Sequence, residues 1–321
     1  MFFLKKNLVK MKNRIKKAWV IFKTLRLRKG YYYFIKNKGL GDIVRSLPAV
    51  LLFAEYKGGD QIKKITILTT ENYAGLVEMN PRVNEVKILT ADVMYAIVNH
   101  LRILKKFFLV YPDADTLNGV LPIYGIPEKF AEKNKHLQQI PHTLGKKSIE
   151  TGMRFVIENH LFPEKTLILV PYARGSSSIE PDHLIRVADH FRKLGFRIFT
   201  NTVNDGDPVS GTETISASAD VVLYVISQGA VVIGVQCGML DACEWMDLSK
   251  RVIKVYRLEK AKDWLYFNNR NGDLGNRIEK KSFGYTIAVS TEEDCMRLED
   301  DIIALSRKMI PDTAVSLENC K

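Results

Sequence analysis

The sequence contains a carboxylate, directly after a glycine-rich loop, that could take part in proton transfer. Asp42 ends the run Lys38-Gly39-Leu40-Gly41-Asp42, between the apolar strand expected at residues 31–35 and an apolar-periodic helix. A strand, a glycine loop and a helix, in this order, point backbone N–H groups and the positive helix end toward a ligand. Asp42 is therefore a candidate general base. A carboxylate in a first helical turn also stabilises the helix dipole, and that second interpretation stays open.

A second candidate is the loop 171–178, which follows an apolar strand. It carries Arg174, Ser176, Ser177 and Ser178. Hydroxyl, N–H and guanidinium donors between a strand and a helix suit an anion such as a phosphate group. The alternative is a plain polar loop in which one serine caps the next helix.

A third candidate is the turn Gln236-Cys237-Gly238, again between an expected strand and an expected helix. Gly238 allows a ligand to approach the backbone closely. Asp241, about one turn into the helix, could accept a hydrogen bond from a ribose or sugar hydroxyl, or could compensate the helix dipole. We interpret Cys237 as a small buried residue and not as a nucleophile, because no histidine lies near it in the sequence.

The sequence offers little support for a bound cofactor or metal ion. The run Gly39-x-Gly41-x-x-Val44 lacks the third glycine of a dinucleotide-binding fingerprint, and Thr69-Thr70 stand where an acidic residue is usual. The Asp-x-Asp pairs at 113–115 and 205–207 lie in turn-rich loops and are interpreted as solvated turns. We therefore expect no metal and no cofactor.

Strands and helices alternate along the chain, which predicts parallel sheets covered by helices. Strands are expected at 65–69, 86–89, 107–111, 166–170, 196–200, 230–235 and 251–256. Helices are expected at 73–79, 93–105, 149–160, 180–194, 219–227, 239–246 and 291–309, and residues 113–147 are expected to form loops. The predicted fold class is α/β, with two Rossmann-like doubly wound domains facing a cleft.

We expect four segments. Residues 1–29 form a basic amphipathic helix, 30–160 an N-terminal domain, 161–290 a C-terminal domain, and 291–321 a terminal helix and tail. This division suits a chain of 321 residues, which is long for a single average domain.

The net charge of +12 belongs to one segment. Residues 1–29 hold eleven Lys or Arg and no Asp or Glu, which leaves 37 basic and 36 acidic residues in the remainder. Apolar residues follow each other at helical spacings of three and four: Leu4, Leu8, Met11, Ile15, Ala18, Phe22 and Leu25. Such a helix suits an anionic membrane surface, with packing or self-association as the alternative. We expect no nucleic-acid partner, because a binding domain would carry its basic stripe on the folded body.

The run from Lys36 to Ala49, Lys-Asn-Lys-Gly-Leu-Gly-Asp-Ile-Val-Arg-Ser-Leu-Pro-Ala, resembles the N-terminal signature of the bacterial heptosyltransferases. These are glycosyltransferases of the GT-B fold that extend lipopolysaccharide cores. The resemblance covers about residues 31–260 and implies that Asp42 is the base for the acceptor hydroxyl. It also implies that the turn 234–241 binds nucleotide-sugar phosphate. The family's Asp-Thr-Gly turn is replaced by Gln236-Cys237-Gly238, and a common donor-loop lysine by Ser178.

The sequence thus predicts a metal-independent, inverting glycosyltransferase of bacterial surface polysaccharide synthesis. Its partners would be a nucleotide-sugar donor as co-substrate, a glycan or lipid-linked acceptor, and an anionic membrane surface bound by residues 1–29. Its expected location is cytoplasmic, peripheral at the inner face of the cytoplasmic membrane. Two alternatives remain: an NAD(P)-dependent Rossmann oxidoreductase that uses the Gly39/Gly41 turn, and a non-catalytic scaffold derived from a glycosyltransferase.

Overall fold

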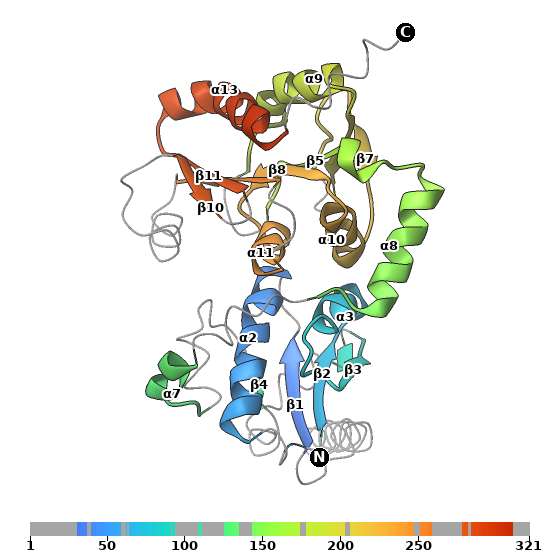
Figure 1. Cartoon of the computed structure of the whole chain (residues 1–321), viewed down its shortest axis with the longest axis vertical. Helices are drawn as coiled ribbons and strands as arrows, with labels where there is room; N and C mark the ends of the chain where they lie inside the picture. The colour runs from blue at the N-terminus through green and yellow to red at the C-terminus, as the bar shows by residue number, and fades with distance from the viewer. Residues whose placement is uncertain are drawn as a thin grey trace, which may run out of the picture. The chain divides into compact units, whose positions relative to one another are not determined.

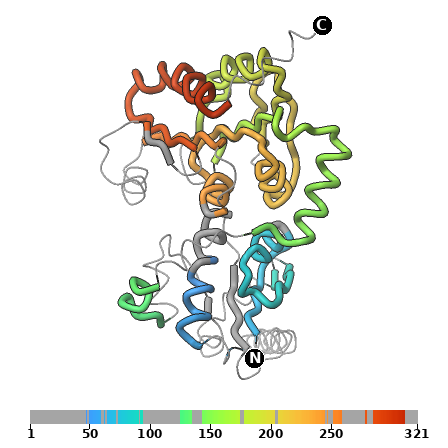
Figure 2. Tube along the Cα trace, viewed as in Figure 1, coloured from blue at the N-terminus to red at the C-terminus, as the bar shows by residue number. Residues whose placement is uncertain are grey.

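The chain divides into two compact units, Met1–Ile140 and Pro141–Lys321, which are described separately. The structure is a computed structural model (Figure 1), and Figure 2 traces the course of its backbone. It describes residues 31–36, 40–58, 62, 64–90, 92–93, 109–110, 125–134, 143–173, 178–202, 206–246, 251–258, 278–281 and 284–310. For 31–46 and a few other positions in these ranges it describes the backbone alone. The basic segment 1–29 and the helix expected at 93–105, apart from its first residue, lie outside these residues.

The first unit contains a parallel sheet in the order β3-β2-β1-β4. Its strands are β1 (Tyr31–Lys36), β2 (Lys64–Thr69), β3 (Glu85–Ile88) and β4 (Leu109–Val110). Its described helices are α2 (Leu40–Tyr56), α3 (Glu71–Val77) and α7 (Glu128–Lys133). Apolar residues of β2 and α2 form the core, because alternate side chains of a buried strand meet the apolar side of the covering helix.

Helix α2 begins earlier than the sequence suggests. It starts at Leu40, so Gly41 and Asp42 belong to its first turn and not to the loop, and it continues through Pro48. A proline inside a helix has no N–H for the helical ladder. Next to it, the buried side chain of Asn80 donates an Nδ2 hydrogen bond of 2.7 Å to the carbonyl oxygen of Leu47. This bond ties the middle of α2 to the segment that follows α3.

The second unit contains a seven-stranded sheet in the order β10-β11-β9-β8-β5-β6-β7. The strands are β5 (Thr166–Val170), β6 (Arg197–Asn201), β7 (Glu213–Ile215), β8 (Val231–Val235), β9 (Val252–Arg257), β10 (Ile278–Lys281) and β11 (Gly284–Val289). All neighbours pair in parallel except β10 with β11. The order of β5 to β9 is the 3-2-1-4-5 arrangement of a Rossmann domain.

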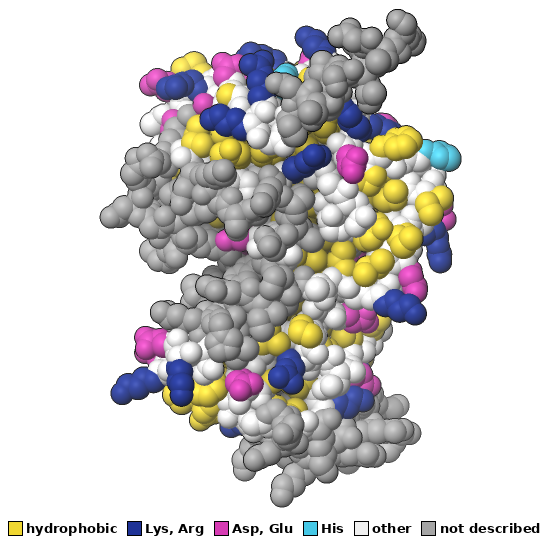
Figure 3. Space-filling view, viewed as in Figure 1, with side chains coloured by type: hydrophobic (Ala, Val, Ile, Leu, Met, Phe, Trp, Pro, Cys, Tyr) yellow, Lys and Arg dark blue, Asp and Glu magenta, His cyan; other side chains and the backbone are white. Residues whose placement is uncertain are grey.

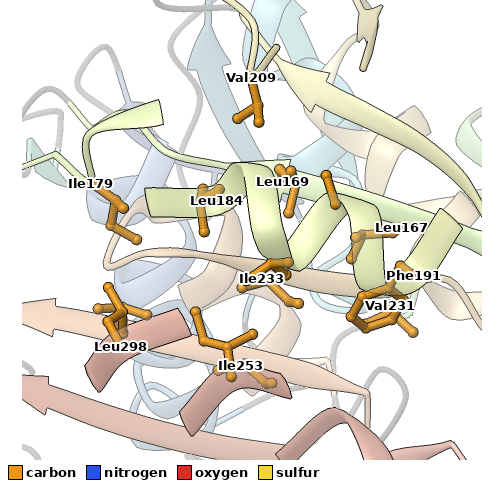
Figure 4. Close-up of a cluster of buried hydrophobic side chains, with 14 of the residues drawn as sticks. Leu167, Leu169, Ile179, Leu184, Phe191, Val209, Val231, Ile233, Ile253 and Leu298 are labelled. Atoms are coloured by element: carbon orange, nitrogen blue, oxygen red, sulfur yellow. The ribbon is translucent and has the colours of Figure 1, made fainter. Parts of the chain in front are cut away.

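Helices cover both faces of this sheet (Figure 1). One face packs on α9 (Ile185–Lys193), on the 3₁₀ turn η4 (Pro181–Leu184) before it, and on α13 (Glu292–Met309). Figure 4 shows the side chains that meet there, among them Leu169, Ile233, Phe191 and Leu298. The other face carries α10 (Ala219–Ser227) and α11 (Gly238–Trp245).

Helix α8 (Lys146–Glu158) belongs to the second unit. The two units therefore divide before this helix, earlier than the expected domain boundary at residue 160. It packs on α10: a Cβ at Gly152 would come within 2.6 Å of the Tyr224 ring, and Ser148 Oγ donates to Asp220 at 2.7 Å. The side of α8 away from α10 exposes Ile149, Met153 and Ile157, and Figure 3 shows hydrophobic side chains gathered there.

Helix ends follow the sequence signals closely. Gly195 has φ of +76°, and its N–H and that of Phe196 bond to the carbonyls of Arg192 and Phe191, which ends α9 as expected. The Thr-Glu-Glu start of α13 is a capping box, in which Thr291 accepts from the Asp294 N–H and Asp294 accepts from the Thr291 N–H.

The predicted α/β class is confirmed, and most expected strands and helices lie within three residues of their expected bounds. Helix α7, inside the region expected to form loops, was not predicted, and neither were the strands β7, β10 and β11. Strand β7 lies at the edge of the sheet, where two of its three side chains are exposed. An edge strand of this kind carries no apolar run that the sequence would reveal.

Candidate functional site

The central strands of the second unit carry two of the three candidate segments. Strands β5 and β8 are parallel neighbours, and Val170 pairs with Gly234 near their carboxyl ends. From this pair the sheet grows through β6 on one side and through β9 on the other. Such a reversal of strand order is the point at which open α/β sheets bind ligands. The loop 171–178 and the turn 236–238 leave the sheet at this edge.

The base of the loop 171–178 is fixed by one backbone hydrogen bond and one from a side chain. The N–H of Ile179 donates to the carbonyl of Pro171 at 2.8 Å. At the end of β9, Arg257 Nη1 donates to the carbonyl of Ser178 at 2.8 Å. Arg257 therefore brings a guanidinium to the loop, a contribution that sequence reasoning missed. Of the predicted anion ligands in the loop, Ser178 is described, and Arg174, Ser176 and Ser177 lie outside the described residues.

Tyr172 connects this loop to the segment after β6. Its hydroxyl donates to the carbonyl of Asp207 at 2.6 Å, and a Cβ at Gly206 would come 2.1 Å from its ring. Burial raises the pKa of Tyr172, and the carboxylates of Asp207 and Glu180 raise it further. The phenol is thus a neutral donor that holds two loops together at the carboxyl edge of the sheet.

The turn after β8 leads directly into α11. The Gln236 N–H donates to the carbonyl of Val255 at 2.8 Å, and Cys237 is the N-cap residue, without a side-chain capping bond. Burial raises the pKa of the Cys237 thiol, although the N–H groups of Met239 and Leu240 partly offset that effect. A protonated thiol is a poor nucleophile. Cys237 is partly exposed, however, and not fully buried as expected.

Asp241 lies in the first turn of α11, as expected, but its carboxylate faces a buried lysine. Oδ1 lies 2.9 Å from Lys254 Nζ and accepts a hydrogen bond of 2.8 Å from Gln236 Nε2. Lys254 also lies 3.0 Å from Glu244 Oε2. The exposed side-chain fractions of Lys254 and Asp241 are 0% and 1%. Asp241 is thus part of a buried ion pair that neither interpretation foresaw, and both the sugar contact and the dipole compensation stay predictions.

Sequence reasoning missed Lys254, although a signal was available. A lysine in the middle of Val-Ile-Lys-Val-Tyr, a run expected to be a buried strand, needs an acidic partner, because lysine is almost never fully buried unpaired. Asp241 and Glu244 stand three residues apart on the preceding helix and so share one face of it.

In the first unit, β1 holds the equivalent central position, with β2 on one side and β4 on the other. Asp42 is the third residue of α2, so its backbone lies in the first turn after this strand. Its side chain, and the predicted loop residues Lys38 and Gly39, lie outside the described part of the structure. In the first unit too, a helix begins shortly after the strand at which the strand order reverses.

Within the described residues, no three His, Cys, Asp or Glu side chains form a group able to hold a metal ion. No described helix combines the length and the apolar character needed to cross a bilayer. Both Asp-x-Asp pairs fall wholly or partly outside the described ranges.

Among the solved structures similar to this chain are two bacterial proteins that match it about equally well. A heptosyltransferase II of E. coli, described as an ADP-heptose enzyme of lipopolysaccharide, has a TM-score of 0.55 at 11% identity. A glycosyl transferase family 9 protein from Veillonella parvula has a TM-score of 0.53 at 10% identity. Each match covers 87% of this chain, and 99% and 96% of the respective solved chains. The fold is GT-B.

The GT-B similarity is one of structure, because no protein-family model and no curated protein matches the sequence. At sequence identities of 10% and 11%, these matches establish a shared fold and nothing further. The predicted fold class, two Rossmann-like units of the GT-B type, is confirmed by these matches together with the strand orders of both sheets.

Proposed function

We propose that this GT-B protein is a glycosyltransferase that moves a sugar from a nucleotide-sugar to a glycan or lipid-linked acceptor. The second unit would bind the donor. The observation that carries the proposal is the pair of turns after β5 and β8, which leave adjacent strands where the strand order reverses. One solved protein similar in fold to this chain is described as an ADP-heptose lipopolysaccharide heptosyltransferase, which supports the reaction class.

The donor diphosphate would lie against these two turns. Helix α11 begins at Gly238, and the N–H groups of Met239 and Leu240 face the thiol of Cys237, a weak acceptor that an anion would replace. Arg174, Ser176, Ser177 and Ser178 would supply donors from the other turn, and Arg257 adds a charge beside Ser178. Amide groups and guanidinium ions can stabilise a departing diphosphate without a divalent cation. The proposal therefore includes no metal and no separate cofactor.

Asp42 would act as the general base. An acceptor hydroxyl attacks the anomeric carbon, Asp42 takes its proton, and the nucleoside diphosphate leaves, with inversion at that carbon. The position of Asp42 in the first turn after the central strand supports this role. Because Gln236-Cys237-Gly238 and Ser178 replace the heptosyltransferase residues, the proposal names a nucleotide-sugar and not ADP-heptose in particular.

Calorimetry tests the donor site. We expect one of ADP, UDP, GDP, CMP or dTDP, or the corresponding sugar nucleotides, to bind in buffer containing EDTA. The matched control is NAD⁺ and NADP⁺, which should not bind. Binding of a nicotinamide cofactor alone would favour the oxidoreductase alternative. No binding of any nucleotide would favour the scaffold alternative and overturn the proposal.

Asp42→Asn tests the base. We expect turnover to fall by on the order of 10²–10⁴-fold, the usual loss for a general base, with donor affinity unchanged. Glu71→Gln is the matched control, because Glu71 is also an acidic residue in a first helical turn of the same unit. Equal activities of the two variants would contradict the assigned role.

We further propose that residues 1–29 hold the enzyme at the anionic inner face of the cytoplasmic membrane, where lipid-linked acceptors lie. The support is their charge of eleven basic and no acidic residues combined with an apolar helical stripe. Deletion of residues 2–29 should abolish sedimentation with vesicles that contain phosphatidylglycerol, and vesicles of phosphatidylcholine are the control. Unchanged sedimentation would leave packing or self-association as the role of this segment.

A further inference from the structure

Lys254 is a fully buried cation directly behind the turn proposed to bind the donor diphosphate. It lies in β9 and pairs in register with Gly234 of β8 and Thr286 of β11. Its side chain points to the side of the sheet that carries α11, where Nζ lies 2.9 Å from Asp241 and 3.0 Å from Glu244. An ion in such a position is costly unless it is paired and hydrogen-bonded. The two carboxylates on α11 supply that pairing.

The contacts continue from Lys254 to the turn. Asp241 Oδ1, which contacts Lys254, also accepts the hydrogen bond from Gln236 Nε2. Gln236 is the first residue of the turn, and its own N–H donates to Val255 of β9. One buried ammonium group therefore fixes a side chain at the start of the turn and a side chain in the first turn of α11.

The charge balance at this point bears directly on anion binding. A carboxylate in the first turn of a helix opposes the positive potential that the helix end offers to an anion. In a buried, weakly polar setting its field would reach the nearby diphosphate with little screening. The ammonium of Lys254, which also pairs with Glu244, offsets the charge of Asp241 at the N-terminus of α11.

We propose that Lys254 is a positioning residue for donor binding, acting through Asp241 and Gln236 to set the geometry and the potential of the turn 236–238. This inference depends on the proposed function, since it assumes that a diphosphate binds at this turn. Lys254 itself touches no substrate in this account.

Variants at Lys254 and Asp241 test the inference by calorimetry with the nucleoside diphosphate that the wild type binds. Lys254→Met should weaken its binding by on the order of tenfold, the effect of one uncompensated charge at close range in a protein interior. The double variant Lys254→Met/Asp241→Asn should recover most of the affinity, because the charge is again balanced. If the double variant binds no better than Lys254→Met, the charge account is overturned.

The Cys237 thiol provides a readout that needs no donor. The charge of Asp241 raises the pKa of Cys237, and that of Lys254 lowers it, after the larger effect of burial. We therefore expect the pH profile of Cys237 alkylation, followed by peptide mass spectrometry, to move to higher pH in Lys254→Met. It should return toward the wild type in the double variant. Cys295, on α13, is the internal control and should not change.

Lost stability must be separated from lost positioning. Val187→Ala, in the apolar cluster on the opposite face of the sheet, is the matched control. It should lower the melting temperature but leave the diphosphate affinity and the Cys237 profile unchanged. If Lys254→Met does not fold, Lys254→Arg, which keeps the positive charge, is compared with the double variant. Equal diphosphate affinities and equal Cys237 alkylation profiles of these two variants would support the inference. A loss of affinity in both variants would overturn it.

The outcomes also separate this inference from the proposed function. A wild type that binds no nucleoside diphosphate overturns the proposed function and with it the role of Lys254. A wild type that binds, together with a Lys254→Met variant that binds equally well and shows an unchanged Cys237 profile, overturns the inference alone.

Discussion

The two faces of the seven-stranded sheet differ in what fills them, although the same strands build both. On strand β9, Ile253 and Val255 enter the apolar cluster with α9 and α13, while Lys254 between them faces α11. Apolar packing on the first face has no directional requirement. The ion-paired face fixes particular atoms at particular distances. Strand β9 thus contributes apolar side chains to one face and, on the other, a buried ion pair that lies behind the turn 236–238.

Removal of a large core side chain should produce the largest loss on the apolar face. Phe191→Ala empties the space of a fully buried ring in α9 and should lower the free energy of unfolding by about 3–5 kcal/mol. Urea unfolding measures this change. Nucleotide affinity of the folded fraction should stay the same, and a changed affinity would show that the two faces are not independent.

Lys254→Met should be comparably costly on the other face, about 3–5 kcal/mol, because it leaves a buried carboxylate without its cation. Unlike the loss on the apolar face, this loss of stability should be partly recovered by a second substitution. Adding Asp241→Asn should restore part of the stability, measured in a double-mutant cycle by urea unfolding. Strictly additive losses would mean that this pair behaves like two ordinary core residues.

Gly234→Ala should have a smaller effect, on the order of 1–3 kcal/mol for overpacking. A Cβ at this position of β8 would come 2.5 Å from the Cβ and the carbonyl oxygen of Val170 in β5. The measurement is again urea unfolding, with Gly195→Asn as control. A Cβ at Gly195 meets nothing within 4 Å, and asparagine tolerates its positive φ, so a large loss there would contradict the packing argument.

Asp294→Ala should have the smallest effect, about 1 kcal/mol for a lost helix cap. Burial alone would raise the pKa of Asp294, but hydrogen bonds from Ser290 and Thr291 outweigh it and hold the pKa below 3.8. Because the folded pKa is lower than the unfolded one, this contribution is complete above about pH 4, near the unfolded value, and is lost as pH falls through the folded pKa.

Thermal unfolding from pH 7 to pH 2 checks this prediction. The difference between the wild type and Asp294→Ala should be constant near neutrality and shrink in acid. Glu292→Gln, in the same helical turn but outside the capping box, is the control and should show a smaller difference throughout.

Much of the fold could be predicted from local sequence signals. The apolar runs of β5 and β8, the Pro181 start and Gly195 end around α9, and the Thr291 cap of α13 are each set by a few neighbouring residues. Short edge strands such as β7 could not be predicted, because their pairing depends on a neighbour and not on their own side chains.

The candidate site was predicted only in part. Asp241 was placed about one turn into a helix expected at 239–246, and the structure confirms that position, although the helix begins one residue earlier, at Gly238. The pairing of Asp241 with Lys254, thirteen residues away on another strand, was not foreseen. Likewise, the contact of Arg257 with Ser178 joins residues that lie far apart along the chain.

The sequence by itself determined the order of elements, the helix caps and the glycine-containing turns that follow strands, because these depend on the conformational preferences of adjacent residues. Tertiary structure alone decided which strand lies beside which, and therefore that the turns after β5 and β8 share one edge. It also decided that Asp241 faces a buried ammonium ion. The physical reason is that desolvation and pairing are set by neighbours in space, and side chains brought together by a parallel sheet are distant in the chain.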